Sequence, residues 1–303
     1  MPVLRLIFFL LLFCVPLTAH SGVTADDFPG STVWYAHADL KQMRTSASGK
    51  DLYNWLDGEV FVEIHEEIGI DVGKETDRIT AFADTERGAV VIVEGPLSKE
   101  SREKMLAIAA TEAKLDMLSS GGKDYYQYGE ENDDASSADF EPLEDGGYFS
   151  FDVKDKVIVT STKEQMEALL KSNGKVAGMG GHPSALFVLT ADKSLVQAGL
   201  RPDELTDDDD DWHSNILRNT EQAALLVADH DGLIAIEARL VASEPGMAES
   251  LGGIINGLIS LQAFNSELEP EILGLIQNTK VEVKDKTLSI NTVIDPALIV
   301  TIL

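Results

Sequence analysis

Cysteine is almost absent from this chain of 303 residues. The single cysteine, Cys14, lies inside an apolar N-terminal run and follows Phe13, whereas a lipoprotein signal has a small residue at that place. If the run is removed on export, the mature chain can form no disulfide, thiolate metal site or cysteine nucleophile. Its stability must then come from burial of the core.

Positive charge is also scarce. The chain has 24 Lys and Arg against 52 Asp and Glu, which gives a formal net charge of −28. Such a surface repels phosphate groups, so nucleic acid is excluded as a partner. The content of hydrophobic residues, 44%, is that of a folded globular protein and excludes a wholly disordered chain.

The N-terminus has the pattern of an export signal. Arg5 precedes an uncharged apolar run over residues 6–17, and small residues follow at Ala19 and Ser21. This pattern predicts a signal peptide over residues 1–21 that is cleaved after Ala19 or Ser21. The run has 12 residues, fewer than the roughly 20 needed to span a bilayer. We therefore expect a periplasmic or secreted protein with no transmembrane segment after cleavage.

Three breaks divide the rest of the chain. Residues 129–147 and 203–211 are rich in carboxylates, and like-charge repulsion favours solvated loops there. Residues 178–184 are rich in glycine and indicate a linker between domains. These breaks predict a first domain over residues 22–177 and a second over residues 185–303.

The two predicted domains repeat the same order of elements. The sequence Val-Lys-Asp-Lys occurs at 153–156 and again at 283–286, each time between alternating strands, which is typical of a hairpin turn. Each half opens with a strand that ends in Ala-Asp, at 33–39 and at 186–192. A helical stretch and two adjacent strands follow each, and in the first half the strands are at 79–83 and 89–94. An apolar helical stripe is predicted over 52–68, and Thr162 with Gln165 forms a capping box for a helix over 163–171. The predicted fold class is α+β, with two tandem, pseudo-duplicated α+β domains that contain antiparallel-type sheets and packed helices.

The motifs of common catalytic sites are incomplete. His65-Glu66 begins like a zinc-protease helix, but Gly69 stands where the second histidine is needed. Gly178-Met-Gly-Gly begins like a dinucleotide loop, but Pro183 replaces the third glycine. No G-x-S-x-G nucleophile pattern occurs. The sequence therefore assigns no catalytic residue, no cofactor and no metal site.

One acidic run was tested as a calcium loop. A calcium-binding EF-hand loop that started at Asp207 would need Gly at position 212 and Glu at position 218, where the chain has Trp212 and Arg218. The motif fails, so a solvated loop is expected. The run could still bind a cation weakly or contact a basic partner. The residues concerned are Asp207, Asp208, Asp209, Asp210, Asp211 and Trp212.

These observations favour a non-catalytic extracytoplasmic binding or scaffold protein. Its partner would be an unknown protein or small ligand of the cell envelope, with the cleft between two like domains as the default ligand site. Two alternatives stay open at this point. One is a periplasmic hydrolase with dispersed active-site residues, and the other is an acidic adaptor or inhibitor of a basic envelope protein.

Overall fold

The computed structural model describes residues 32–85, 88–129, 146–176, 185–198, 218–262 and 270–298. Helix and strand take nearly equal shares, 40% and 41%, so the predicted α+β class is confirmed. The chain forms two compact units. Of the described residues, the first unit contains 32–45 and 52–176, and the second contains 46–51 and 185–298.

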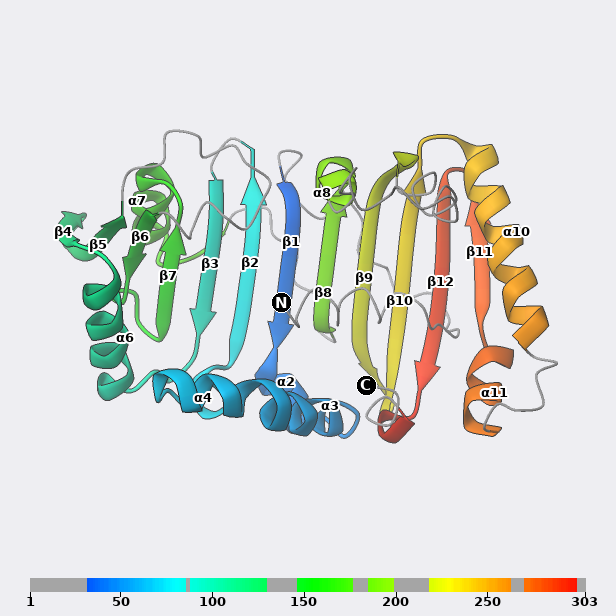
Figure 1. Cartoon of the computed structure of the whole chain (residues 1–303), viewed down its shortest axis with the longest axis horizontal. Helices are drawn as coiled ribbons and strands as arrows, with labels where there is room; N and C mark the ends of the chain where they lie inside the picture. The colour runs from blue at the N-terminus through cyan, green and yellow to red at the C-terminus, as the bar shows by residue number, and fades with distance from the viewer. Residues whose placement is uncertain are drawn as a thin grey trace. The chain divides into compact units, whose positions relative to one another are not determined.

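The strands of the first unit pair in the order β1-β2-β3-β7-β6-β5-β4 (Figure 1). Every pairing along this order is antiparallel. The strands predicted near residues 33–39, 79–83 and 89–94 are all present. The bounds are β1 Thr32–Asp39, β2 Arg78–Asp84, β3 Gly88–Glu94, β4 Leu115–Ser120, β5 Lys123–Gly129, β6 Gly146–Ser150 and β7 Lys156–Thr160.

The helices between these strands begin where side chains can cap them. The Asp39 carboxylate accepts the Gln42 amide at the start of α2, and the predicted capping residue Thr162 accepts the Gln165 amide at the start of α7. The apolar stripe predicted over 52–68 forms two α-helices joined by one π-helical stretch. The bounds are α2 Leu40–Thr45, α3 Gly49–Leu56, π-helix η2 Asp57–Phe61, α4 Val62–Ile68, α5 Val72–Glu75, α6 Lys99–Glu112 and α7 Lys163–Lys171.

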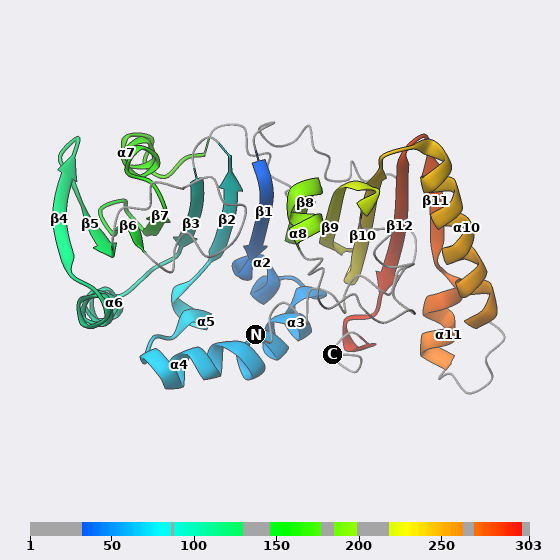
Figure 2. The same cartoon turned by 45° about the horizontal axis from the view of Figure 1, so that its top comes forward.

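The second unit has a smaller sheet in the order β8-β9-β10-β12-β11, again with antiparallel pairings. One long helix, α10, lies beside the terminal strand β11 in both views (Figures 1 and 2). The strand bounds are β8 Ala185–Asp192, β9 Thr220–His230, β10 Leu233–Ala242, β11 Lys280–Lys284 and β12 Thr287–Ile294; the helices are α8 Lys193–Ala198, α10 Pro245–Gln262 and α11 Pro270–Gln277.

The two Val-Lys-Asp-Lys segments both connect neighbouring antiparallel strands, as predicted. Lys284 is paired with Thr287, so Asp285 and Lys286 form a two-residue hairpin turn, whereas the β6–β7 connection is longer. Asp155 and Asp285 have φ angles of 55° and 54°, in the left-handed region. Asp tolerates that region better than most residues because its short side chain bonds locally to the backbone.

The first unit buries one face of its sheet almost completely. Directly opposite residues on neighbouring strands share a face, and one such row runs across β1, β2, β3, β7 and β6. The members of the row are at most 5% exposed, and they are Tyr35, Phe82, Val90, Thr160 and Tyr148. Helix α7 covers part of this face, because the Tyr125 hydroxyl of β5 lies 3.1 Å from the Glu167 carboxylate of α7.

Candidate functional site

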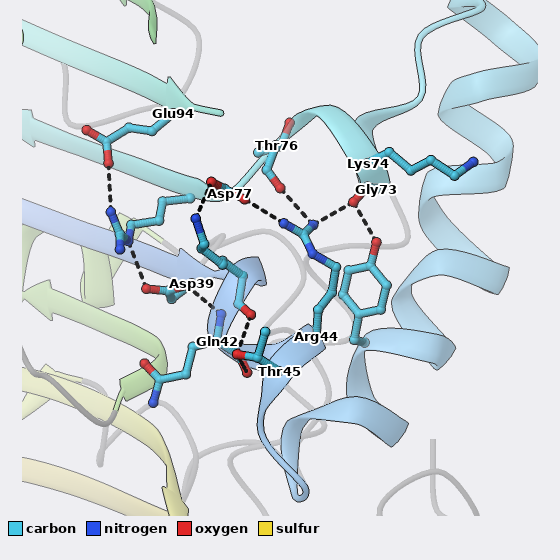
Figure 3. Close-up of polar contacts among 12 residues, drawn as sticks. Asp39, Gln42, Arg44, Thr45, Gly73, Lys74, Thr76, Asp77 and Glu94 are labelled. Carbon is cyan, nitrogen blue, oxygen red and sulfur yellow. Dashed lines mark hydrogen bonds and ion pairs between the residues drawn. The ribbon is translucent and has the colours of Figure 1, made fainter. Parts of the chain in front are cut away.

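Charged side chains gather where the central strands of the first unit end, and Arg44 is at the centre of this network (Figure 3). From the last turn of α2, its Nη1 donates to the carbonyl oxygens of Gly73 at 2.6 Å and Thr76 at 2.9 Å. Its Nη2 donates to Asp77 Oδ1 at 2.6 Å. The planar fork of a guanidinium can serve several acceptors at once, which an ammonium on a flexible stem does less well.

Tyr53 of α3 supports Arg44 from one side. The guanidinium carbon lies 5.4 Å from the centre of the Tyr53 ring, within the range of a cation–π contact. The Tyr53 hydroxyl also donates to the Gly73 carbonyl at 2.6 Å. A Cβ at Gly73 would lie 2.6 Å from Asp57 Oδ1 and 2.8 Å from the Tyr53 hydroxyl oxygen, so any side chain there would displace these two groups.

A second part of the network is a row of alternating charges. Asp39, Arg78, Glu94 and Lys156 are opposite one another across β1, β2, β3 and β7. Arg78 Nε lies 2.8 Å from Asp39 Oδ2, and its Nη1 lies 3.5 Å from Glu94 Oε2. Glu94 also pairs with Lys156. The hydrogen bond with Asp39 raises the pKa of the Arg78 guanidinium above its ordinary value.

The charged groups of this network bond to one another and to the main chain, which gives the network a structural role. Each carboxylate in the row faces a cation, and Arg44 is committed to two main-chain carbonyls and to Asp77. A general base or nucleophile needs a lone pair directed at a substrate, whereas these groups neutralise one another. The network fixes α2 and α5 against the ends of the strands.

Two further polar side chains also bond to other side chains of the protein. His37 Nδ1 lies 2.9 Å from the Thr80 hydroxyl on the neighbouring strand, and its ring stacks on Tyr35 at 6.4 Å between centroids. In the second unit, the fully buried Ser48 hydroxyl donates to the Asp229 carboxylate. In the described part of the chain, no group of three or more His, Cys, Asp or Glu could hold a metal ion.

The other face of this sheet is also apolar, and much of it is buried, with Trp34 at 2% and Phe149 at 6% exposed. A row of opposite residues crosses it from β2 to β4, and we name it the apolar strand row: Ala81, Val91, Val159, Phe149, Tyr126 and Met117. Its last member, Met117, is 66% exposed. Phe149 stacks on Tyr126 at 5.1 Å between ring centroids and meets Phe151 edge-on at 5.6 Å. The open end of the row, at Tyr126 and Met117, is the candidate binding surface.

The residues that the sequence singled out lie elsewhere. Asp207–Asp211 and Trp212 are outside the described residues, as are the predicted linker 178–184, residues 130–145 of the first acidic loop and the predicted signal peptide. Sequence reasoning missed the network around Arg44 and the apolar strand row. The Tyr125-Tyr126-Gln127-Tyr128 segment was the one available signal for the row, since aromatic residues favour strands.

Comparisons with known proteins leave the family open. No protein-family model and no curated protein matches the sequence. Three solved structures of TP0453, described as crystal forms III, I and IV, cover 93% of this chain and 98%, 97% and 96% of their own. Their sequence identities are 9%, 8% and 8%, and their TM-scores are 0.44, 0.40 and 0.47.

Proposed function

We propose that the protein is a non-catalytic binding or scaffold protein that acts outside the cytoplasm. The observation that supports this most strongly is the apolar strand row, which ends in Met117 with two thirds of its surface open to solvent. Tyr and Met are enriched at protein interfaces, where they supply large contact areas. The charged row from Asp39 to Lys156 lies on the other face of the sheet, so the open end of the apolar strand row offers apolar contact.

Location outside the cytoplasm is part of the same proposal. Its support is the N-terminal pattern of Arg5, the apolar run and the small residues Ala19 and Ser21. Mass spectrometry of protein recovered from the periplasm or the medium should find an N-terminus at His20 or Gly22. Soluble protein that still begins at Met1 would contradict it.

Binding through the apolar strand row can be separated from the acidic-adaptor alternative by salt. Exposed charges are screened within about 8 Å at 0.15 M ionic strength, while apolar burial is not weakened by screening. Immobilised protein should retain its envelope partner when the salt concentration is raised, and Met117→Asp should release it. Val62→Asp, at an aliphatic residue of α4 that is 45% exposed, is the matched control.

Two results would argue against this assignment. Capture that disappears at high salt and survives Met117→Asp would favour the acidic adaptor. Turnover in a panel of ester, glycoside, phosphate-ester and peptide substrates, lost on substitution of a described carboxylate, would favour the hydrolase.

We also propose that the two units arose by duplication. In support, β1-β2-β3-β7 and β8-β9-β10-β12 have the same order, and each first strand has a bulge after its first residue, at Thr32/Trp34 and at Ala185/Phe187. Asp39 and Asp192 each cap the helix that follows. An experimental structure in which residues 32–39 and 185–192 superpose together with the strands that follow would support common descent, and different bulge positions would count against it.

A further inference from the structure

Helix α10 of the second unit has an apolar face that is exposed to solvent. Its inner face buries Ala248, Leu251 and Gly252. On the other side, Ile254, Leu258 and Leu261 are 38%, 50% and 71% exposed. Because residues at i, i+4 and i+7 lie on one side of a helix, these three aliphatic side chains form one continuous stripe.

Small residues lie alongside the stripe. Gly253 and Gly257 have nothing within 4 Å of where a Cβ would be, whereas a Cβ at Gly252 would meet Val283 Cγ2 at 2.5 Å. Packing inside the unit thus explains Gly252 and leaves Gly253 and Gly257 unexplained, although glycine is unfavourable in a helix interior. We name the whole surface the α10 face, and it comprises Ser250, Gly253, Ile254, Gly257, Leu258 and Leu261.

Charge narrows the choice of partner. Residues 250–262 contain no ionisable side chain in a protein with a net charge of −28. A basic partner would be attracted to the acidic surface elsewhere on the chain. The neighbouring edge strand β11 exposes Lys280, Glu282 and Lys284, and charges on an edge strand oppose pairing with another strand. The α10 face is therefore a neutral surface for helix packing.

We propose that the α10 face binds the same face of a second copy of this chain, with the two helices antiparallel. When the helices are aligned about a two-fold axis between Ile255 and Asn256, each large side chain lies opposite a small residue of the other copy. Ile254 is opposite Gly257, Leu258 is opposite Gly253, and Leu261 is opposite Ser250. Such a face is complementary to itself, as an isologous interface requires.

Side-chain size also selects the antiparallel direction. Parallel pairing in register would place large residues opposite large ones, Ile254 against Ile254 and Leu258 against Leu258.

Sedimentation of the purified protein between about 1 and 100 µM tests the proposal, because the mass of a self-associating protein depends on concentration. We expect a monomer that converts to a dimer, with Leu258→Glu remaining monomeric across the range. Val62→Glu, the control at an exposed aliphatic residue of the first unit, should dimerise like the unchanged chain. Circular dichroism of each variant checks that it is folded.

A swap of large and small residues tests the alignment itself. Gly257→Ile places two isoleucines opposite each other and should raise the dissociation constant at least tenfold. Adding Ile254→Gly to this variant restores one large residue opposite one small residue and should recover most of the affinity. A protein that stays monomeric to about 100 µM, a dimer that survives Leu258→Glu, or a swap that recovers nothing would overturn the proposal. So would a monomer whose α10 face instead binds phosphatidylcholine vesicles.

Discussion

At the scale of single residues, Arg44 connects α2 to the backbone and the carboxylate that precede β2. Only a quarter of it is exposed, and it serves two main-chain carbonyls and one carboxylate. We expect Arg44→Lys to lower the free energy of unfolding by about 1–2 kcal/mol, because an ammonium cannot reproduce this fork of charge-assisted bonds. Urea denaturation measures the change.

Lys41 provides the control for Arg44. It pairs with the same carboxylate, that of Asp77, at 3.1 Å, but its side chain is 59% exposed. Lys41→Met should change stability by less than about 0.5 kcal/mol, since exposed ion pairs contribute little. Equal losses for the two variants would show that burial of Arg44 is irrelevant to its role.

Thr292 of β12 is buried without a visible partner. It is 1% exposed, and its hydroxyl makes no hydrogen bond to the described residues. Thr292→Val should therefore raise the free energy of unfolding by about 1 kcal/mol, because the cost of desolvating the hydroxyl is removed.

Thr160 of β7 should respond in the opposite direction. It is equally buried, but its hydroxyl donates to the Thr162 carbonyl at 2.8 Å. Thr160→Val should destabilise by about 1 kcal/mol. Thermal unfolding of both variants in parallel measures the two changes in stability. A loss of stability in Thr292→Val would reveal a partner for that hydroxyl.

Burial of tyrosine predicts a response to high pH. Desolvation raises the pKa of Tyr35 from 10 to about 12, and it does the same for Tyr128. Near pH 10 the two tyrosine hydroxyls lose their protons in the unfolded chain but keep them in the folded chain. The contribution of these protonated tyrosines to the free energy of unfolding is therefore complete below pH 10 and disappears as the pH approaches 12. Urea denaturation at pH 9 and at pH 11 measures the effect. The free energy of unfolding should fall less between these two pH values for Tyr35→Phe than for the unchanged chain. An unchanged loss would contradict the assigned cause.

At the scale of elements, Gly252, Gly253 and Gly257 of α10 separate the effect of packing from that of helix propensity. Gly253→Ala and Gly257→Ala should each raise stability by about 0.5–1 kcal/mol, because alanine favours the helix and the space beside them is open. Gly252→Ala should lower stability, since its Cβ would overlap Val283. Melting is best followed at submicromolar concentration, where self-association does not contribute. Stabilisation by Gly252→Ala would show that β11 can move away.

The sequence predicts the main elements well where the local signal is strong. Apolar runs of the buried-strand type located β1 and β8, and capping located α7. The β4–β5 hairpin was missed, although Gly121 and Gly122 form its turn with positive φ angles, because the pattern of β4 alternates only weakly. The row from Asp39 to Lys156 could not be foreseen, because it depends on pairing between β3 and β7, whose partners are distant in sequence.

At the scale of the whole molecule, the net charge of −28 should dominate the response to cations. Five carboxylates in succession at Asp207–Asp211 attract divalent ions, but the run lacks the glycine and the bidentate acid of a calcium loop. We expect millimolar calcium and magnesium to raise the melting temperature equally, by screening repulsion over the whole surface. A specific site occupied at 100 times its dissociation constant would instead add about 2.7 kcal/mol for calcium alone. A calcium-specific rise that disappears when the five aspartates are replaced by serine would establish a metal site in this run.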